Sequence, residues 1–246
     1  MQLSLIIPAY NEAQRLPQTL GEMFQWLDAH LDMAYEILVI DDGSTDDTLV
    51  LLAPFLISRQ KQFRLIEQPH NLGKGAAVRR GMLEARGDIR IFLDADHSTH
   101  IRECTKVISA MQSGADVVIA SRQHPQSIIP IRQSWLRERM GKTFNRLMRL
   151  MIQLEFIDTQ CGFKACSAQA AIAIFTQQQL DGFSFDVEML YLAKRSAFNI
   201  SEIPIEWRNE SNSKVRMLVD PMLMFVDIVR IRRLHKKIPI PQKKIV

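Results

Sequence analysis

The 246-residue sequence has few cysteines and no long apolar run. Its three cysteines, Cys104, Cys161 and Cys166, include no Cys-x-x-Cys pair. An odd number without that spacing supports neither a disulfide framework nor a zinc site, and it is typical of a reducing compartment. No stretch of about 18 uncharged apolar residues occurs, and the N-terminal run at residues 3–7 is stopped by Pro8. We therefore expect a soluble or peripheral protein without a signal peptide or a membrane-spanning helix.

The N-terminal part also lacks a glycine-rich loop carrying arginine and lysine, which a nucleotidyltransferase would use to grip a triphosphate. This argues against that class of enzyme. With 47% hydrophobic and 24% charged residues, the chain has an ordinary globular composition and can bury one full core. The net charge is only +4, but basic residues concentrate at 132–149 and 230–244. This asymmetry favours an anionic surface or substrate, and we expect no nucleic-acid partner.

Strands and helices alternate along the first half of the chain. Apolar runs predict strands at residues 3–8, 36–40, 63–67, 89–93 and 116–120. Helical spacing predicts helices at 9–27, after residue 46, at 76–82 and at 101–112, and Ser44 or Thr45 could cap the second of them. The alternation predicts an α/β fold with a mainly parallel sheet flanked by helices. In such sheets ligands bind at the carboxyl ends of the strands.

Polar residues follow every predicted strand. They are Asn11 and Glu12, Asp41 and Asp42, residues 71–74, Asp94 and Asp96, and Ser121 with Arg122. Because the carboxyl ends of parallel strands meet at one edge of a sheet, we expect a single shared site rather than loops that are merely hydrophilic.

The pair Asp94 and Asp96 is the clearest chemical signal in this set. Two carboxylates one residue apart repel each other unless a cation lies between them, and oxygen ligands suit Mg²⁺ and Mn²⁺. An isolated pair is often only a solvated acidic loop, but the neighbouring strand ends favour a metal site. Ser98, a short hydroxyl residue just beyond the pair, is the third candidate ligand.

In order and spacing, these motifs resemble glycosyltransferase family 2, which has the Rossmann-like GT-A fold. The matching segments are 8–12, 41–46, 71–75, 94–96 and 121–122. Residues 158–164, 182–190 and 213–214 look like those of the dolichyl-phosphate glucosyl- and mannosyltransferases, and 158–164 is most similar to the β-glucosyltransferase branch. The resemblance covers residues 3–216. The sequence departs from the family in two places. Eukaryotic glucosyltransferases carry an N-terminal membrane segment that this sequence does not show, and Ser98 stands where some mannosyl enzymes have glutamine.

The resemblance implies a nucleotide-sugar donor in the first half of the sheet. The implied donor-binding residues are Pro8, Tyr10, Asn11, Glu12, Asp41, Asp42, Lys74 and Asp94. Pro8, Tyr10 and Glu12 would shape the nucleoside pocket, although Pro8 could equally serve simple turn chemistry. Asp41 and Asp42 would bind base or ribose, and Lys74 would approach the phosphates. Asp94 and Asp96 would hold Mg²⁺ or Mn²⁺ against the diphosphate and make it a better leaving group.

A lipid phosphate is a suitable acceptor, because it is already an anion near neutral pH and needs no strong general base. The candidates for holding it are Arg122, Arg137, Arg208 and Lys214, and Arg122, Arg208 and Lys214 join Asp94 and Asp96 as candidate catalytic residues. A carboxylate base at Asp186 or Glu188 would instead indicate a hydroxyl acceptor. Otherwise Glu188 is expected to orient Arg208 or a helix end.

Two segments favour contact with a membrane surface. Residues 132–154 combine an apolar stripe with a separate basic stripe, which predicts an amphipathic interfacial helix with Arg137 at headgroup level. Packing of that stripe on the protein's own sheet is the alternative. Residues 217–246 contain an apolar run followed by a basic cluster, which anionic headgroups attract. We therefore predict a GT-A domain at 1–216 with C-terminal amphipathic interfacial helices, and a membrane-associating segment at 217–246.

The sequence thus predicts an inverting glycosyltransferase that moves glucose from UDP-glucose to a polyprenyl phosphate. We expect it to be peripheral at the cytoplasmic face of a membrane. GDP-mannose as donor, a saccharide hydroxyl as acceptor, and a non-catalytic nucleotide-sugar-binding module remain as alternatives.

Overall fold

A single mixed sheet organises the protein. The computed structural model describes residues 1–130, 156–208 and 219–236. Within them the sheet has seven strands in the order β3-β2-β1-β4-β6-β5-β7. Neighbouring strands run parallel to each other, except that β6 runs antiparallel to both β4 and β5. The strands are β1 (Gln2–Ala9), β2 (Ala34–Asp41), β3 (Phe63–Glu67), β4 (Ile89–Leu93), β5 (Val117–Ser121), β6 (Phe163–Ser167) and β7 (Ile200–Pro204).

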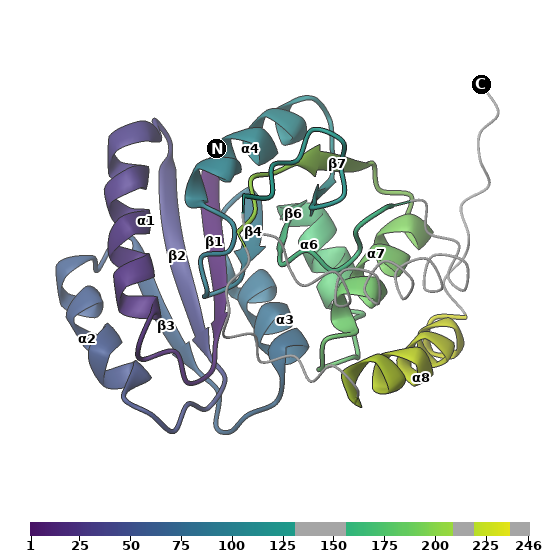
Figure 1. The fold of residues 1–246 in the computed structure, drawn as a ribbon, viewed down its shortest axis with the longest axis horizontal. Helices are drawn as coiled ribbons and strands as arrows, with labels where there is room; N and C mark the ends of the chain where they lie inside the picture. Colours follow the sequence, from purple (N-terminus) through teal and green to yellow (C-terminus); the bar gives the residue numbers. More distant parts are fainter. Residues whose placement is uncertain (131–155, 209–218, 237–246) are drawn as a thin grey trace.

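Helices cover both faces of this sheet (Figure 1). They are α1 (Leu16–His30), α2 (Thr48–Ser58), α3 (Lys74–Glu84), α4 (Cys104–Gln112, after the 3-10 turn Ile101–Glu103), α6 (Ala168–Phe175), α7 (Phe185–Arg195) and α8 (Val219–Leu234). Successive side chains of a strand point to opposite faces. Leu5 and Ile7 therefore join a core with α1 and α4, while Ile6 joins a second core with α3, α6 and α7. The predicted α/β fold with a mainly parallel sheet is confirmed.

The central strands are buried on both faces, which explains their continuous apolar runs. The predicted strands at 63–67 and 89–93 match β3 and β4, and the other three agree to within two residues. The first helix begins later than predicted because Pro17 occupies its first turn, a position where the missing N–H costs nothing. The predicted capping by Ser44 or Thr45 is wrong, since α2 begins at Thr48.

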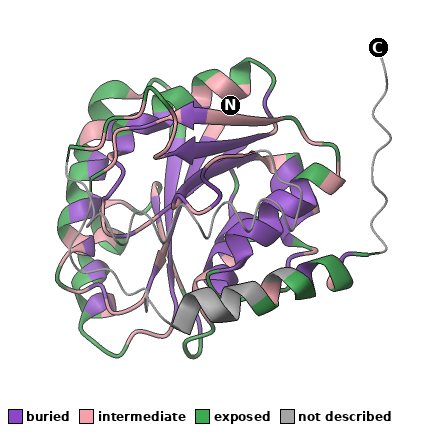
Figure 2. Cartoon of the chain, turned by 45° about the vertical axis from the view of Figure 1, so that its right-hand side comes forward, coloured by how far each residue is buried: buried purple, intermediate pink, exposed green. Residues whose placement is uncertain are grey.

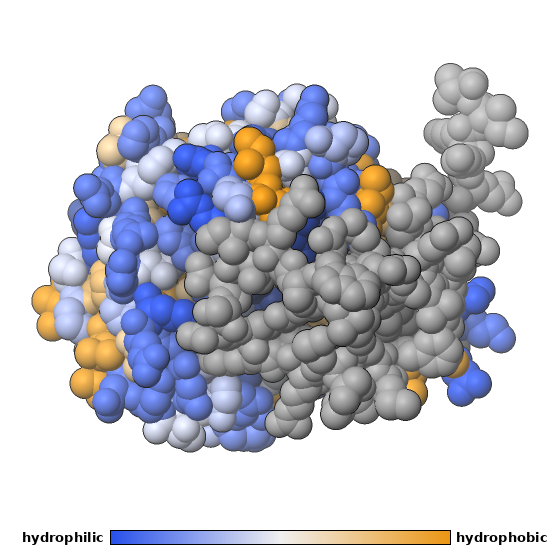
Figure 3. Space-filling view, viewed as in Figure 1, coloured by the Kyte–Doolittle hydropathy of each residue, from blue (hydrophilic) through white to orange (hydrophobic). Residues whose placement is uncertain are grey.

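Two helices differ in how they are covered. Helix α7 is buried from Phe185 to Ala193, whereas α8 lies across it with an exposed outer side (Figure 2). The inner side of α8 packs through Ile231, which is fully buried. On the opposite side of the molecule, α2 exposes the apolar residues Val50, Leu51, Leu56 and Ile57. Orange atoms gather over α2 at the left of Figure 3. No helix in the described part of the chain is long and apolar enough to cross a membrane. The predicted interfacial helix at 132–154 lies outside the described residues.

Candidate active site

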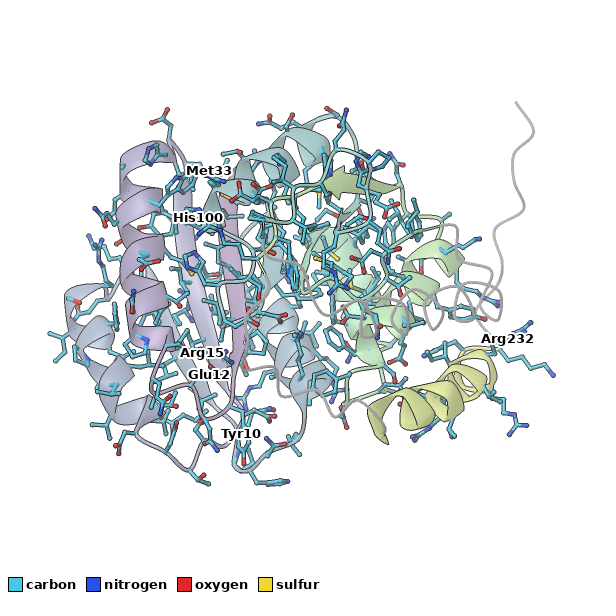
Figure 4. All side chains as sticks on the ribbon, viewed as in Figure 1. Tyr10, Glu12, Arg15, Met33, His100 and Arg232 are labelled. Atoms are coloured by element: carbon cyan, nitrogen blue, oxygen red, sulfur yellow. The ribbon has the colours of Figure 1, made fainter. Side chains whose placement is uncertain are left out.

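The carboxyl ends of β1, β2, β3 and β4 lie at one edge of the sheet, because these four strands are parallel. This edge is at the bottom of the view in Figure 4, where the labels mark Tyr10, Glu12 and Arg15. The segments that follow these strands carry most of the residues expected to form the site. The structure therefore brings the predicted donor-binding residues to a single edge.

A pocket of about 480 Å³ lies beyond the ends of β1, β2 and β3. It is lined by Tyr10, Asp41, Gly43, Ser44, Thr45, Leu49, Glu67, Gln68, Pro69, His70 and Asn71. Asp41 is 1% exposed, and its Oδ2 accepts a hydrogen bond from the Ser44 N–H at 2.9 Å. Its Oδ1 is buried with no hydrogen-bond partner in the described protein. A buried carboxylate oxygen costs free energy unless it is paired, so Asp41 is suited to receive an N–H or O–H donor from a ligand.

Asn11 fixes the wall of this pocket. It has a positive φ of 52°, its N–H donates to Ser44 Oγ at 2.9 Å, and its Oδ1 accepts from the Thr45 N–H at 2.8 Å. Glu12 is buried beneath, where it pairs with Arg15 and its N–H donates to Thr48 Oγ1. Pro8 is the penultimate residue of β1 and lies opposite Ile40.

Asp42 has a different environment from its neighbour Asp41. Its carboxylate accepts the N–H groups of Leu72 and Gly73, both at 2.8 Å, and the side-chain amide of Gln68 at 2.6 Å. Gly73 has a φ of 106°, and a Cβ there would lie 2.5 Å from the Asp181 carbonyl oxygen, so only glycine fits. Asp42 thus holds the loop that leads directly into Lys74, the first residue of α3.

Lys74 forms an ion pair with Asp94, at 2.5 Å from Nζ to Oδ1. Burial alone would lower the pKa of the Lys74 ammonium, but the carboxylates of Asp94, Asp186 and Asp96 outweigh it and raise that pKa. The other side of Asp94 lies against Gly162, because a Cβ on Gly162 would be only 1.9 Å from Asp94 Oδ2. The Asp94 N–H also donates to the Gly162 carbonyl at 3.1 Å. The carboxylate of Asp94 therefore lies between Gly162, the residue before β6, and Lys74 at the start of α3.

Asp96 and Ser98 lie in the turn that follows β4. Asp96 is half-buried, and its Oδ1 accepts the Ser98 N–H at 3.0 Å. Ser98 is buried, and its carbonyl accepts the Arg208 N–H. Between them His97 has a positive φ of 58°, and its Nδ1 lies 3.2 Å from Glu22. A non-glycine residue with positive φ next to a candidate ligand is consistent with a site that fixes its backbone.

Asp94 and Asp96 offer hard oxygen donors to a divalent cation. Within the described residues no group of three or more histidine, cysteine, aspartate or glutamate side chains could hold a metal on its own. Mg²⁺ is commonly bound through only one or two carboxylates, with the remaining ligands supplied by substrate phosphates and water. The donor set at this edge therefore fits a cation that binds together with a phosphate ligand.

A buried ion pair behind these carboxylates was not predicted from the sequence. Lys164, the second residue of β6, is fully buried and donates to Asp186 Oδ1 at 2.5 Å and to the Cys161 carbonyl at 2.6 Å. Burial raises the pKa of Asp186, and the ammonium groups of Lys164 and Lys74 oppose that shift. The only sequence signal is a lysine within the otherwise apolar run at 161–166, which implies a buried acidic partner.

Glu188 is also fully buried. Its oxygens accept the N–H groups of Gln179 and Leu180, and Oε1 lies 2.6 Å from His235 Nε2 just beyond α8. Glu188 therefore holds the segment before α7 and the end of α8. Of the two roles predicted for Glu188 other than a general base, orienting a helix end agrees with these contacts, whereas Arg208 pairs with Glu206.

Arg122 is positioned by Asp158. Its Nε and Nη2 donate to the two Asp158 oxygens at 2.7 and 2.8 Å, and its guanidinium lies 5.4 Å from the Trp207 ring centre. Burial opposes the charged form, but the Asp158 carboxylate raises the pKa of Arg122, so the guanidinium stays protonated. Its Nη1 amino group lies outside the bidentate pair. Arg208 is 61% exposed, and Arg137 and Lys214 lie outside the described residues.

The sequence profile of Glycosyl transferase family 2 matches residues 4–175, which is most of the chain. The chain therefore belongs to this family of glycosyltransferases. The dolichyl-phosphate beta-glucosyltransferase of Dictyostelium discoideum is 35% identical over 94% of this chain and 73% of its own length. The enzymes of the same name from Saccharomyces cerevisiae and Mus musculus are 35% and 30% identical, over 94% of this chain and 74% and 75% of theirs.

Solved structures support the same fold. The glucosyl-3-phosphoglycerate synthase of Mycobacterium tuberculosis, crystallised with Mn²⁺, UDP and phosphoglyceric acid, superposes with a TM-score of 0.69. The superposition covers 98% of this chain and 80% of that one at 18% identity. A complex of the same enzyme with Mg²⁺ and UDP gives 0.68 at 19% identity, over 98% and 81% of the two chains. At this identity the likeness concerns the fold alone, and it agrees with the predicted GT-A architecture.

Proposed function

We propose that this protein transfers glucose from UDP-glucose to a polyprenyl phosphate, with inversion at the anomeric carbon. The observation that carries the donor half of the proposal is the unpartnered, buried Asp41 oxygen on the wall of a pocket at the same edge as the Lys74–Asp94 pair. The names of the relatives, which match over almost the whole chain, support glucose as the sugar and a lipid phosphate as the acceptor.

The pocket would bind the nucleoside of the donor. Asp41 accepts a hydrogen bond from the base or the ribose, and Tyr10 bounds the pocket beside it. Pro8 lies in β1, opposite Ile40, and would act only by shaping the end of that strand. Asn11 and Glu12 act indirectly, because their hydrogen bonds position the loop at 44–48 that lines the pocket. Asp42 acts through the backbone it holds, because Leu72 and Gly73 place Lys74 where a diphosphate would lie. Lysine suits this role as a mobile point charge for phosphate.

Asp94 and Asp96, with Ser98 beside them, are the proposed ligands of Mg²⁺ or Mn²⁺. When bound, such a cation neutralises the diphosphate and makes it a better leaving group. The Mn²⁺ and Mg²⁺ complexes of the structurally similar synthase support this choice of metals.

The acceptor phosphate is proposed to bind at Arg122, with Arg137, Arg208 and Lys214 as further cationic partners. Arg122 is held rigidly by Asp158, so it can hold an anion without losing further side-chain entropy. Glu188 has both oxygens engaged in buried hydrogen bonds, and Asp186 is paired with Lys164. These contacts favour an acceptor that needs no general base over a saccharide hydroxyl.

We further propose that the enzyme works as a peripheral protein at the cytoplasmic face of a membrane. The outer side of α8 supports this, because it exposes Val226 and Val229 together with Arg230 and Arg233. Apolar and basic side chains on one exposed face suit the boundary between acyl chains and anionic headgroups.

The test is incubation with a short polyprenyl phosphate, Mg²⁺ or Mn²⁺, and each of several UDP- and GDP-sugars, followed by mass spectrometry of the lipid. We expect a hexosyl-phosphate lipid from UDP-glucose, and none from the variant Asp96→Ala. A product from GDP-mannose alone would replace the proposed donor. Transfer to a saccharide without a lipid product would replace the proposed acceptor.

A further inference from the structure

Lys74 and Asp94 are in direct contact although both are expected to bind other partners during the reaction. Their charged atoms are 2.5 Å apart, and the side chains are 21% and 35% exposed. Both groups are thus accessible to an incoming ligand. In this arrangement the Lys74 ammonium is bound to an Asp94 carboxylate oxygen that a divalent cation would need as a ligand.

Neighbouring charged side chains already have partners of opposite charge, so Lys74 and Asp94 are the groups that can change partners. Asp186 is compensated by buried Lys164, and Arg122 is compensated by Asp158. Among the described residues, the carboxylates that act on the Lys74 ammonium are those of Asp94, Asp186 and Asp96, and with Asp186 compensated, Asp94 and Asp96 remain to face it. A divalent cation arriving alone would have to displace the ammonium and would then lie beside it, so like charges would oppose its binding.

We propose that Lys74 is an exchangeable counter-ion, which occupies Asp94 in the donor-free enzyme and releases it when a divalent cation arrives together with a diphosphate. The inference rests on the proposed function and adds an order of events to it. In the exchange, Asp94 passes from the ammonium to the cation, and Lys74 passes from Asp94 to a phosphate oxygen. Asp94 and Lys74 each leave one opposite charge for another, so the exchange leaves neither of these two groups uncompensated.

Two features of the structure allow the exchange without rearranging the fold. Asp94 stays in place because its N–H and its carboxylate are fixed against Gly162. The backbone of Lys74 stays in place because the N–H of the next residue, Gly75, donates to the Asp181 carbonyl at 2.7 Å and Gly73 is held by Asp42. Only the flexible Lys74 stem has to move, and Asp186 provides a second negative charge near its ammonium.

The consequence is that the enzyme should bind metal weakly alone and tightly with nucleotide. We would test this by measuring Mn²⁺ binding, through the loss of its free electron paramagnetic resonance signal, with and without UDP. In Lys74→Met, the affinity for Mn²⁺ alone should increase about tenfold or more, equivalent to about 1.4 kcal/mol. The enhancement of Mn²⁺ binding by UDP should shrink in the same variant.

Two control variants separate this effect from net charge and from loss of the side chain. Lys74→Arg keeps a cation at the position and should bind Mn²⁺ alone as weakly as the wild type. Arg80→Met removes a charge further along α3, where Arg80 pairs with Glu84, and should also leave Mn²⁺ binding unchanged. If Lys74→Met binds Mn²⁺ alone no more tightly than the wild type, the exchange is refuted while the proposed function stands. If the wild type binds no Mn²⁺ even with UDP, the metal assignment and this inference both fail.

Discussion

Replacing Gly162 by alanine tests the placement of Asp94 with a single methyl group. The added Cβ would lie 1.9, 2.4 and 2.7 Å from Oδ2, Cγ and Oδ1 of Asp94. Because nonbonded contacts of carbon are ordinarily about 3.5 Å, the carboxylate would have to withdraw by roughly 1.5 Å. The Asp94 side chain is 35% exposed, so the added methyl group can push its carboxylate out of its native position toward solvent without disturbing the core. We therefore expect the Gly162→Ala variant to fold normally but to catalyse sugar transfer more slowly.

The expected loss of activity is large. A misplacement of about 1 Å in a catalytic group can cost about a hundredfold in rate, which corresponds to about 2.7 kcal/mol of transition-state stabilisation. The assay is the initial rate of lipid-linked sugar formation at saturating acceptor, with the thermal midpoint measured in parallel. The matched control is Gly182→Ala, where a Cβ meets nothing within 4 Å. If Gly162→Ala retains activity close to that of Gly182→Ala, Asp94 is not held as described or is not required.

Three further predictions address other parts of the site. Asp41→Ala should raise the KM for UDP-glucose about tenfold or more with little change in kcat, because a charged hydrogen bond to the donor is worth about 1.5–3 kcal/mol; an unchanged KM would remove Asp41 from the donor pocket. Treatment with EDTA should abolish turnover, and added Mn²⁺ or Mg²⁺ should restore it; full activity in EDTA would exclude the metal. Asp158→Asn should lower the free energy of unfolding in urea by about 3 kcal/mol at pH 7, because it leaves Arg122 without its buried partner. Burial favours the neutral Asp158 carboxyl, but Arg122 outweighs it and lowers the pKa below the unfolded value. That stabilisation is therefore complete above about pH 4 and is lost as the pH falls further, so the difference between wild type and variant should narrow in acid. If the difference in unfolding free energy between the wild type and Asp158→Asn did not change with pH, the stabilising role of the ion pair would be contradicted.

Strands β1, β2, β4 and β5 could be predicted because they are buried along almost their whole length. Such strands leave continuous apolar runs, and β4 agrees with its expected range. The edge strand β3 also agrees, although only Phe63 of it is buried. The parallel edge strand β7, most of which is only half-buried, was not predicted. Strand β6 could not be recognised in this way, since Lys164 interrupts its apolar pattern. Its antiparallel insertion between β4 and β5 depends on pairings between residues far apart in the sequence, which no local pattern encodes.

The sequence could predict which residues gather at the edge of the sheet, but it could not predict the contacts that each of them makes. Strand ends indicated that Asp41, Asp42, Lys74 and Asp94 would gather, because parallel strands share an edge. The sequence could not distinguish Asp41, with its unpartnered oxygen, from Asp42, which is saturated by backbone N–H groups. That difference arises from how the loop at residues 68–73 folds back onto β2.

The fixed position of Asp94 likewise required the structure. Gly162 lies 68 residues beyond Asp94, in a segment whose resemblance to the glucosyltransferase branch gave no physical reason for the glycine. The close approach of the carboxylate provides that reason.

The central claim is that the edge carrying Asp94 and Asp96 binds a divalent cation together with a nucleotide diphosphate. The most direct measurement is anomalous diffraction at a wavelength sensitive to manganese, from crystals grown with Mn²⁺ and UDP. We predict one strong peak within coordination distance of Asp96 or Asp94 and of the diphosphate, with the base in the pocket beside Asp41. A diphosphate bound away from both carboxylates, with no manganese peak between them, would contradict the account.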